Sequence, residues 1–288
     1  MAIRLALNEK GEVSSPFISA LAGSTIRLWH DETKDAHPFV AHGLAYRGFE
    51  RSSLKFLDRL EQVTALTGSA PDQELALAFG DVVYRAAEAF EFYKKRVPAA
   101  LSPPRVGQFR RPLKDYDTTI RRLLKHWATV CNAMKHASNI MVPVVATFER
   151  GTVVHGYSVC GHVHEGLALN KDIHRDQRSF AYAVEIKRLI HDLLRADLAA
   201  ARLVTSAPTE GAVEVRQSHS NIGLAALTAR LNGIPAKGLP ECVSMADSYT
   251  LTDGAIILER SHVAIMGETA RVSVAYTVQE ATRHFPLP

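Results

Sequence analysis

Asn132, Lys135 and His136 lie close together and carry the side chains that phosphate chemistry uses. Asn132 and His136 are four positions apart, so in a helix they lie one turn from each other on the same face. Histidine moves a proton near neutral pH, and RNA cleavage by a 2′-hydroxyl needs one proton removed and one supplied. Lys135 would stabilise the charged transition state. The spacing predicts cleavage without metal or cofactor, with His136 as general acid or base and Asn132 positioning the phosphate.

Basic residues precede this group in the same segment. When successive residues are placed about 100° apart, one side of the helix collects the apolar residues Ile120, Leu123, Leu124, Trp127, Val130, Cys131, Met134 and Met141. The opposite side collects polar residues, among them Arg122 and Lys125, with Arg121 close beside it and His126 at its flank. We expect these four residues to bind the RNA backbone. The alternative is an ordinary solvated face of an amphipathic helix.

The run Cys131-Asn132-Ala133-Met134-Lys135-His136, in a long helix, resembles the motif of HEPN domains. In that family an Arg, often followed by Asn, shortly precedes a His, and the helix pairs with its copy across a dimer to form a composite ribonuclease site. The resemblance covers at most residues 41–142. It implies a helical bundle, a homodimer and an RNA-associated activity, for example a metal-independent endoribonuclease of a toxin or host-defence type.

This sequence departs from the HEPN pattern at one position, because Cys131 stands where the family has Arg. Arg121 followed by His126 is a second match that lacks the Asn, and Arg122 of a partner chain is another source of the guanidinium. The departure equally fits a protein without nuclease activity. The alternative function is therefore non-catalytic dimerisation, or binding of a nucleotide, RNA or partner protein.

A histidine-rich run supplies the candidate metal ligands Cys160, His162 and His164. In a strand these alternate residues share one face, but the outer pair would be about 13 Å apart. Zinc would therefore need a further ligand from elsewhere, such as His155 or His174. The alternative is a surface hairpin rich in histidine.

Composition excludes several classes of protein. With 47% hydrophobic residues in 288, the chain can form packed cores. Its apolar runs fall short of the roughly 20 residues of a membrane span, and the first residues lack a secretory signal, so we expect a cytoplasmic protein. The three cysteines form no CxxC pair, and no Walker, Rossmann or GxSxG motif occurs. A net charge of +4 permits a nucleic-acid partner.

Periodicity predicts an α+β fold. Helical spacing of apolar residues favours helices over 48–67, 70–96, 113–139, 179–203 and 222–231, with a proline-rich loop over 98–112. Alternation and β-branched residues favour strands over 144–148, 152–160, 254–258 and 272–278, the first two joined in a hairpin through Arg150-Gly151. We expect a helical HEPN-like domain over residues 1–142 and a mixed strand and helix region over 143–288 that senses a ligand or partner, with a weaker boundary near 208.

Overall fold

The computed structural model describes most of the chain. The described residues are 15–22, 38–65, 71–100, 106–136, 139–148, 153–163, 166–175, 179–206, 227, 230–231, 234, 250–252, 255–265 and 268–277. The helices among them are α1 (Pro16–Ala22), α2 (Pro38–Ala65), α3 (Gln73–Glu91), the π-helix η2 (Phe92–Arg96), α4 (Val97–Ala100), α5 (Val106–His136) and α6 (Tyr182–Thr205). The strands are β1 (Ile140–Phe148), β2 (Val153–Val163), β3 (Gly166–Leu169), β4 (Phe180–Ala181), β5 (Thr250–Thr252), β6 (Ala255–Ile265) and β7 (Glu268–Thr277).

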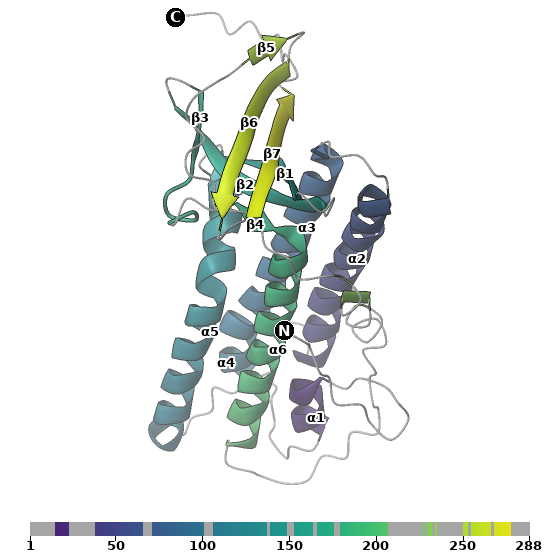
Figure 1. Cartoon of the computed structure of the whole chain (residues 1–288). Helices are drawn as coiled ribbons and strands as arrows, with labels where there is room; N and C mark the ends of the chain where they lie inside the picture. The colour runs from purple at the N-terminus through teal and green to yellow at the C-terminus, as the bar shows by residue number, and fades with distance from the viewer. Residues whose placement is uncertain are drawn as a thin grey trace, which may run out of the picture. The chain divides into compact units, whose positions relative to one another are not determined.

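The chain has a mixed helix-and-strand fold, as its periodicity predicts, and it divides into two compact units (Figure 1). The first, here called the helical unit, comprises Met1–Asp58, Ala78–Cys131 and Ala183–Ala236. The second, the sheet unit, comprises Arg59–Leu77, Asn132–Tyr182 and Lys237–Pro288. The expected boundary at residue 142 stays a prediction.

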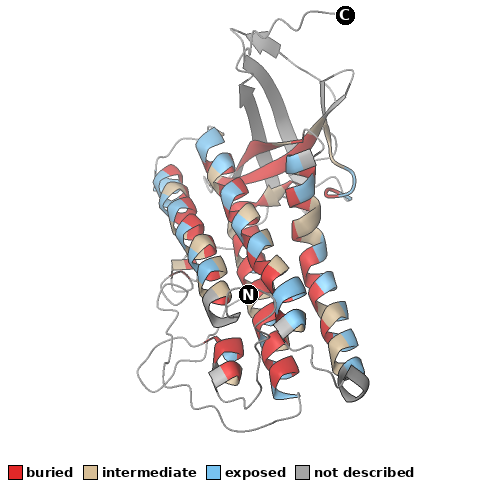
Figure 2. Cartoon of the chain, turned by 180° about the vertical axis from the view of Figure 1, so that it is seen from behind, coloured by how far each residue is buried: buried red, intermediate tan, exposed pale blue. Residues whose placement is uncertain are grey.

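In the helical unit, α2, α3, α5 and α6 run side by side, and each carries a stripe of buried residues beside an exposed one (Figure 2). The core contains Phe49 and Phe56 of α2, Phe79 and Phe90 of α3, Trp127 of α5 and Leu189 of α6, each no more than 1% exposed. Burying an apolar side chain of this size stabilises the fold by about 1.5–3 kcal/mol. The recurrence of apolar residues at three- and four-residue spacing is therefore what assembles these helices.

In the sheet unit, the strand order is β3-β2-β1-β7-β6-β5, and β4 pairs with β2. All the pairings in this sheet are antiparallel. The predicted hairpin is present as β1 and β2, although its turn lies outside the described residues. Residues 141–146 and 154–160 are buried without interruption, which indicates strands covered on both faces. Pro143 is accommodated because β7 pairs with β1 only from Val144 onward.

Several helix boundaries differ from the predicted ones. The first predicted helix starts earlier, at Pro38, and Gly48 lies inside it. Pro98 does not end the second helix: η2 follows α3 directly, α4 follows η2, and Pro98 is the second residue of α4. The loop predicted through Pro112 is wrong over 106–112, because α5 begins at Val106 and contains that proline.

The end of α5 is set by a buried asparagine. Asn139 donates from its backbone N–H (3.4 Å) and from Nδ2 (3.3 Å) to the carbonyl of Ala133, and this satisfies an end-of-helix acceptor. The helix therefore ends at His136 instead of Asn139, and Met141 lies in β1 and not on the apolar stripe of α5.

Several other predicted elements are confirmed. The helix expected over 179–203 is α6, which follows the short strand β4, and the strands expected over 254–258 and 272–278 are parts of β6 and β7, which pair with each other. The second helix opens where expected: Asp72 accepts a hydrogen bond from the N–H of Leu75 (2.7 Å), as an N-cap does. Most of the helix expected over 222–231 lies outside the described residues.

Candidate functional site

The amphipathic character of α5 is as the sequence predicts. Ile120, Leu123, Leu124, Trp127 and Val130 are buried, whereas Met134 is only partly buried. On the other side Arg121, Arg122 and Lys125 are exposed. The apolar side of α5 is buried in the core, so the long cationic side chains on its other side lie in solvent.

The exposed cations extend over several turns of α5. The helix contains seven Lys or Arg residues and two Asp, a net charge of +5, whereas α2 contains four Lys or Arg and three acidic residues, a net charge of +1. In the helical unit, the sector that holds Arg122 also holds Arg111, Lys114, Arg121 and Lys125, all exposed. The rise of 1.5 Å per residue spreads this sector over about 21 Å. We call these five residues the basic face.

Members of the basic face differ in how they are neutralised. Arg121 Nε lies 2.8 Å from Asp117 Oδ2, one turn earlier on the same helix. Arg122 and Lys125 form no ion pair with any other described residue. Asp117 therefore partly neutralises Arg121, whereas the positive charges of Arg122 and Lys125 are available to an anion.

The residues predicted to be catalytic belong to the sheet unit. Asn132 and Lys135 are exposed at the end of α5, and the side chain of His136 lies outside the described residues. Cys131 is 3% exposed. Cys131 is thus buried, and its neighbour Asn132 is in solvent.

His126 belongs to a polar cluster between α5 and α6 of the helical unit. Its Nε2 lies 3.1 Å from Oε2 of Glu185, a carboxylate that is 3% exposed. Arg188 Nη1 lies 3.5 Å from the other oxygen of Glu185, and its guanidinium carbon is 5.7 Å from the centre of the Trp127 ring. Trp127 in turn donates from Nε1 to Asp192 (3.0 Å).

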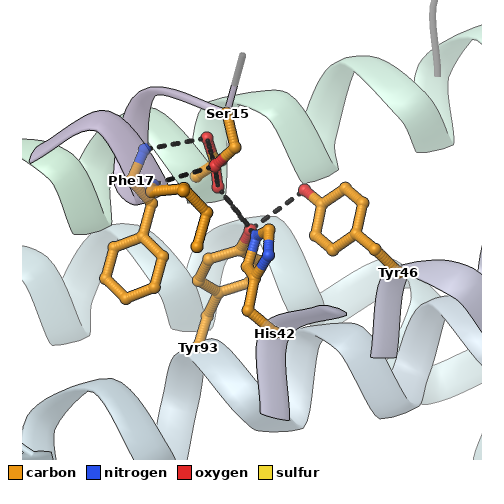
Figure 3. A network of polar contacts seen from close by, with 7 residues as sticks. Ser15, Phe17, His42, Tyr46 and Tyr93 are labelled. Carbon is orange, nitrogen blue, oxygen red and sulfur yellow. Dashed lines mark hydrogen bonds and ion pairs between the residues drawn. The ribbon is translucent and has the colours of Figure 1, made fainter. Parts of the chain in front are cut away.

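A second polar cluster, which sequence reasoning missed, surrounds the buried carboxylate of Asp197 in the helical unit (Figure 3). Asp197 is 1% exposed. Ser15 Oγ donates to both of its oxygens (2.8 and 2.9 Å), the Phe17 N–H donates to Oδ2 (3.2 Å), and His42 Nε2 lies 3.2 Å from Oδ1. Tyr93 OH donates to Oδ1 (2.8 Å).

Two tyrosines extend this network. The hydroxyls of Tyr93 and Tyr46 are 2.9 Å apart. A phenol has one proton, so Tyr46 must donate to Tyr93 when Tyr93 donates to Asp197. Burial and the Asp197 charge raise the pKa of both tyrosines well above the ordinary value, so both stay protonated and can serve as donors.

The π-helix η2 positions Tyr93 for this contact. Its wider turn places Phe92 and Tyr93 together in the core, and Tyr116 of α5 donates to the Tyr93 carbonyl (2.6 Å). At the start of α1, Ser15 and Phe17 contact Asp197. Ser15 Oγ also accepts a hydrogen bond from the Ile18 N–H (3.1 Å) and so caps the N-terminus of α1. The Asp197 cluster therefore fastens α1, α2, η2 and α6 to one another.

Of the candidate metal ligands, the structure describes the side chains of Cys160, His155 and His174. No group of metal-ligating side chains occurs among the described residues. Burial raises the pKa of the Cys160 thiol to about 12. His174 Nε2 accepts a hydrogen bond from the Val159 N–H (2.8 Å) and so faces backbone. The side chain of His162 and all of His164 lie outside the described residues.

A sequence signal for the missed carboxylates does exist. Asp197 interrupts the apolar stripe of α6 formed by Ile190, Leu193, Ala201 and Val204, and Glu185 interrupts the stripe of Tyr182 and Leu189. A charged residue at an apolar position requires a partner when it is buried. The sequence does not show which distant residues supply that partner.

Comparison with known proteins found no match: no family model, no curated protein and no solved structure corresponds to this chain. Among the described helices, none combines the length and apolar content that crossing a bilayer requires.

Proposed function

We propose that this protein binds RNA through the basic face of α5 and is a metal-independent endoribonuclease of the HEPN-like kind, acting as a homodimer. The observation that carries the proposal is the cationic sector of Arg111, Lys114, Arg121, Arg122 and Lys125, which lies in solvent on the side of α5 that the core does not use. Phosphate contacts supply most of the sequence-independent affinity of a protein for nucleic acid.

The chemistry of this face favours the RNA backbone over the bases. Two aromatic side chains of α5 near this face, Tyr116 and Trp127, are 4% and 0% exposed and cannot stack on a base. A face about 21 Å long can contact the phosphates of a few successive nucleotides in an extended RNA strand. We therefore expect binding that depends strongly on salt and weakly on sequence.

The binding experiment compares two double variants with equal loss of charge. Arg122→Gln with Lys125→Gln neutralises the basic face, and Arg51→Gln with Lys55→Gln removes two exposed cations from α2 as the matched control. For single-stranded RNA, losing two phosphate contacts should reduce the slope of log affinity against log salt by about 1.4 and weaken binding roughly 10- to 30-fold near 0.1 M salt. The control should bind as the wild type does.

Equal loss of affinity in both double variants would show a general charge effect and contradict the assignment to α5. Absence of RNA binding by the wild-type protein would contradict the proposal as a whole.

Cleavage is tested with a mixed RNA pool in EDTA, comparing the wild type with His136→Ala after both are shown to fold equally. The sequence assigns the proton transfer to His136, with Asn132 and Lys135 beside the phosphate. Loss of cleavage in the variant alone supports that assignment. Binding without cleavage by the wild type supports the alternative function, a non-catalytic RNA-, nucleotide- or partner-binding protein. The burial of Cys131 where HEPN domains present Arg favours this second candidate.

A further inference from the structure

A second row of cations lies on α6, the helix that packs against α5. Arg188, Arg195 and Arg202 follow one another at intervals of seven residues, which is close to two helical turns, so they lie on one face of α6. All three are exposed. The rise of 1.5 Å per residue gives them a length of about 21 Å, equal to that of the basic face. We call these three residues the arginine row.

The arginine row is little neutralised by its own helix. Arg188 Nη1 lies 3.5 Å from Oε1 of the buried Glu185. Arg195 and Arg202 form no ion pair with any other residue that the structure describes. The acidic residues of α6 are buried or bonded to α5: Glu185, Asp192 and Asp197. The row therefore presents its positive charge to solvent.

The arginine row runs alongside the basic face. Trp127 of α5 donates to Asp192 (3.0 Å) of α6. Tyr116, earlier on α5, donates to the carbonyl of Tyr93, whose hydroxyl donates to Asp197, later on α6. Contacts thus move backward along α5 as they move forward along α6, so the two helices are antiparallel. Helices in contact lie about 8–10 Å apart, so the two rows of cations lie beside each other over their length.

Both rows border the surface seam between the two helices. His126 follows Arg122 by four residues, on the same side of α5. It contacts Glu185 (3.1 Å) and is 18% exposed, so the seam reaches the surface there. Glu185 precedes Arg188 by three residues on α6. The seam is therefore flanked by Arg122 on the α5 side and by Arg188 on the α6 side.

We propose that the RNA bound by this protein is double-stranded where it lies on α5 and α6, with the phosphates of one strand on the basic face and those of the other on the arginine row. This inference rests on the proposed function and names the substrate class of that site. A duplex presents two rows of phosphates, one from each strand, and RNA duplexes are recognised mainly by their shape and by phosphate and 2′-hydroxyl contacts.

The aromatic side chains of this surface favour a duplex over an unpaired strand. Proteins that hold single-stranded RNA stack its bases on exposed aromatic rings. Here Tyr116 and Trp127 are 4% and 0% exposed, and α6 contains no Phe, Tyr or Trp after Tyr182. The bases of a duplex are already stacked on one another, so two rows of cations suffice to bind it.

The experiment measures affinity for an RNA duplex of about 16 base pairs and for each of its separated strands over a range of salt concentrations. Eight cations on a duplex give a slope of log affinity against log salt of up to about 7, and the five of the basic face on a single strand give up to about 3.5. The wild type should bind the duplex at least about tenfold more tightly than either strand near 0.1 M salt.

Two double variants with equal loss of charge test the arginine row. Arg195→Gln with Arg202→Gln is the α6 variant, and Arg51→Gln with Lys55→Gln on α2 is the matched control. All four side chains are exposed, so both variants should unfold in urea as the wild type does. For the duplex, the α6 variant should lose about 1.8 in slope and roughly 20- to 60-fold in affinity near 0.1 M salt. For single strands it should lose less than about threefold, and the control should bind both ligands as the wild type does.

The results that overturn the inference are distinguishable from those that overturn the proposed function. Wild-type protein that binds single strands as tightly as the duplex would refute the inference and leave RNA binding by α5 in place. The same holds for an α6 variant that loses affinity equally for both ligands, or that binds the duplex as the control does. Absence of binding to the duplex and to both strands would refute the inference and the proposed function together.

Discussion

Replacing Asp197 with Asn should lower the free energy of unfolding by about 3 kcal/mol. The carboxylate is 1% exposed and is contacted by Ser15, Phe17, His42 and Tyr93. An amide has one oxygen, so one end of the side chain turns from acceptor to donor. Placed at Oδ2, the new NH₂ group would face the N–H of Phe17 and leave a buried donor unpaired, at a cost of about 1–3 kcal/mol.

The remaining contacts would weaken as well. Hydrogen bonds to a charged group contribute about 1.5–3 kcal/mol and neutral ones about 0.5–1.5 kcal/mol, so the three contacts at Oδ1 would each lose roughly 1 kcal/mol. Relief of the cost of burying a charge offsets part of this loss. A net of about 3 kcal/mol is a large fraction of the roughly 5–15 kcal/mol that stabilises a domain.

The assay is equilibrium unfolding in urea at neutral pH, followed by circular dichroism. Tyr93→Phe removes one donor to the carboxylate, and the double variant completes a thermodynamic cycle. Because both residues act in one network, the two losses should not add, and we expect a coupling energy of about 1–2 kcal/mol. A change below about 0.5 kcal/mol for Asp197→Asn, or strict additivity, would refute the reasoning that this carboxylate fastens the helices.

Two further predictions concern the sheet unit. Gly161→Ala should destabilise the protein by about 1–3 kcal/mol, because the added Cβ would lie 2.9 Å from Asn139 Oδ1. That oxygen cannot move away easily, since it accepts a hydrogen bond from Asn170 Nδ2 (3.2 Å). Urea unfolding measures the loss, which should be smaller when Gly161→Ala is combined with Asn139→Ala. Burial lowers the pKa of His155 below its ordinary value, and its Nε2 has no hydrogen-bond partner among the described residues. Protons therefore bind the unfolded state more readily, and stability should fall as pH drops below about 6.5. His155→Leu should flatten that fall, and equal pH dependence of the two proteins would contradict it.

The periodicity of the sequence predicts most of the described helices and strands, because the spacing of apolar residues along the chain decides which side chains of an element can be buried together. The apolar side of α5 is the clearest case: Ile120, Trp127 and Val130 are each 0% exposed, as their spacing predicts. Boundaries were less accurate where one interaction decides them. Pro98 lies inside α4, directly after a π-helix that the sequence pattern did not predict, and α5 ends at His136, where Asn139 donates to the carbonyl of Ala133.

The candidate sites divide in the same way. The basic face follows from the positions of charged residues along one helix, so Arg121, Arg122 and Lys125 could be named from the sequence alone. The contact of His126 with Glu185 could not be named, because the two residues are far apart in the chain and meet only when α5 packs against α6.

The sequence by itself determined which residues of each helix enter the core and which stay in solvent, since a spacing of three and four residues fixes the side of a helix on which a side chain lies. It therefore determined the basic face of α5. Only the tertiary structure decided what the charged residues on the apolar stripe of α6 would meet. The donors to Asp197 come from Ser15 at the start of α1, from α2 and from η2, and Glu185 contacts His126 of α5. A buried charge must find its partners wherever packing brings them, and packing joins residues that no local pattern relates.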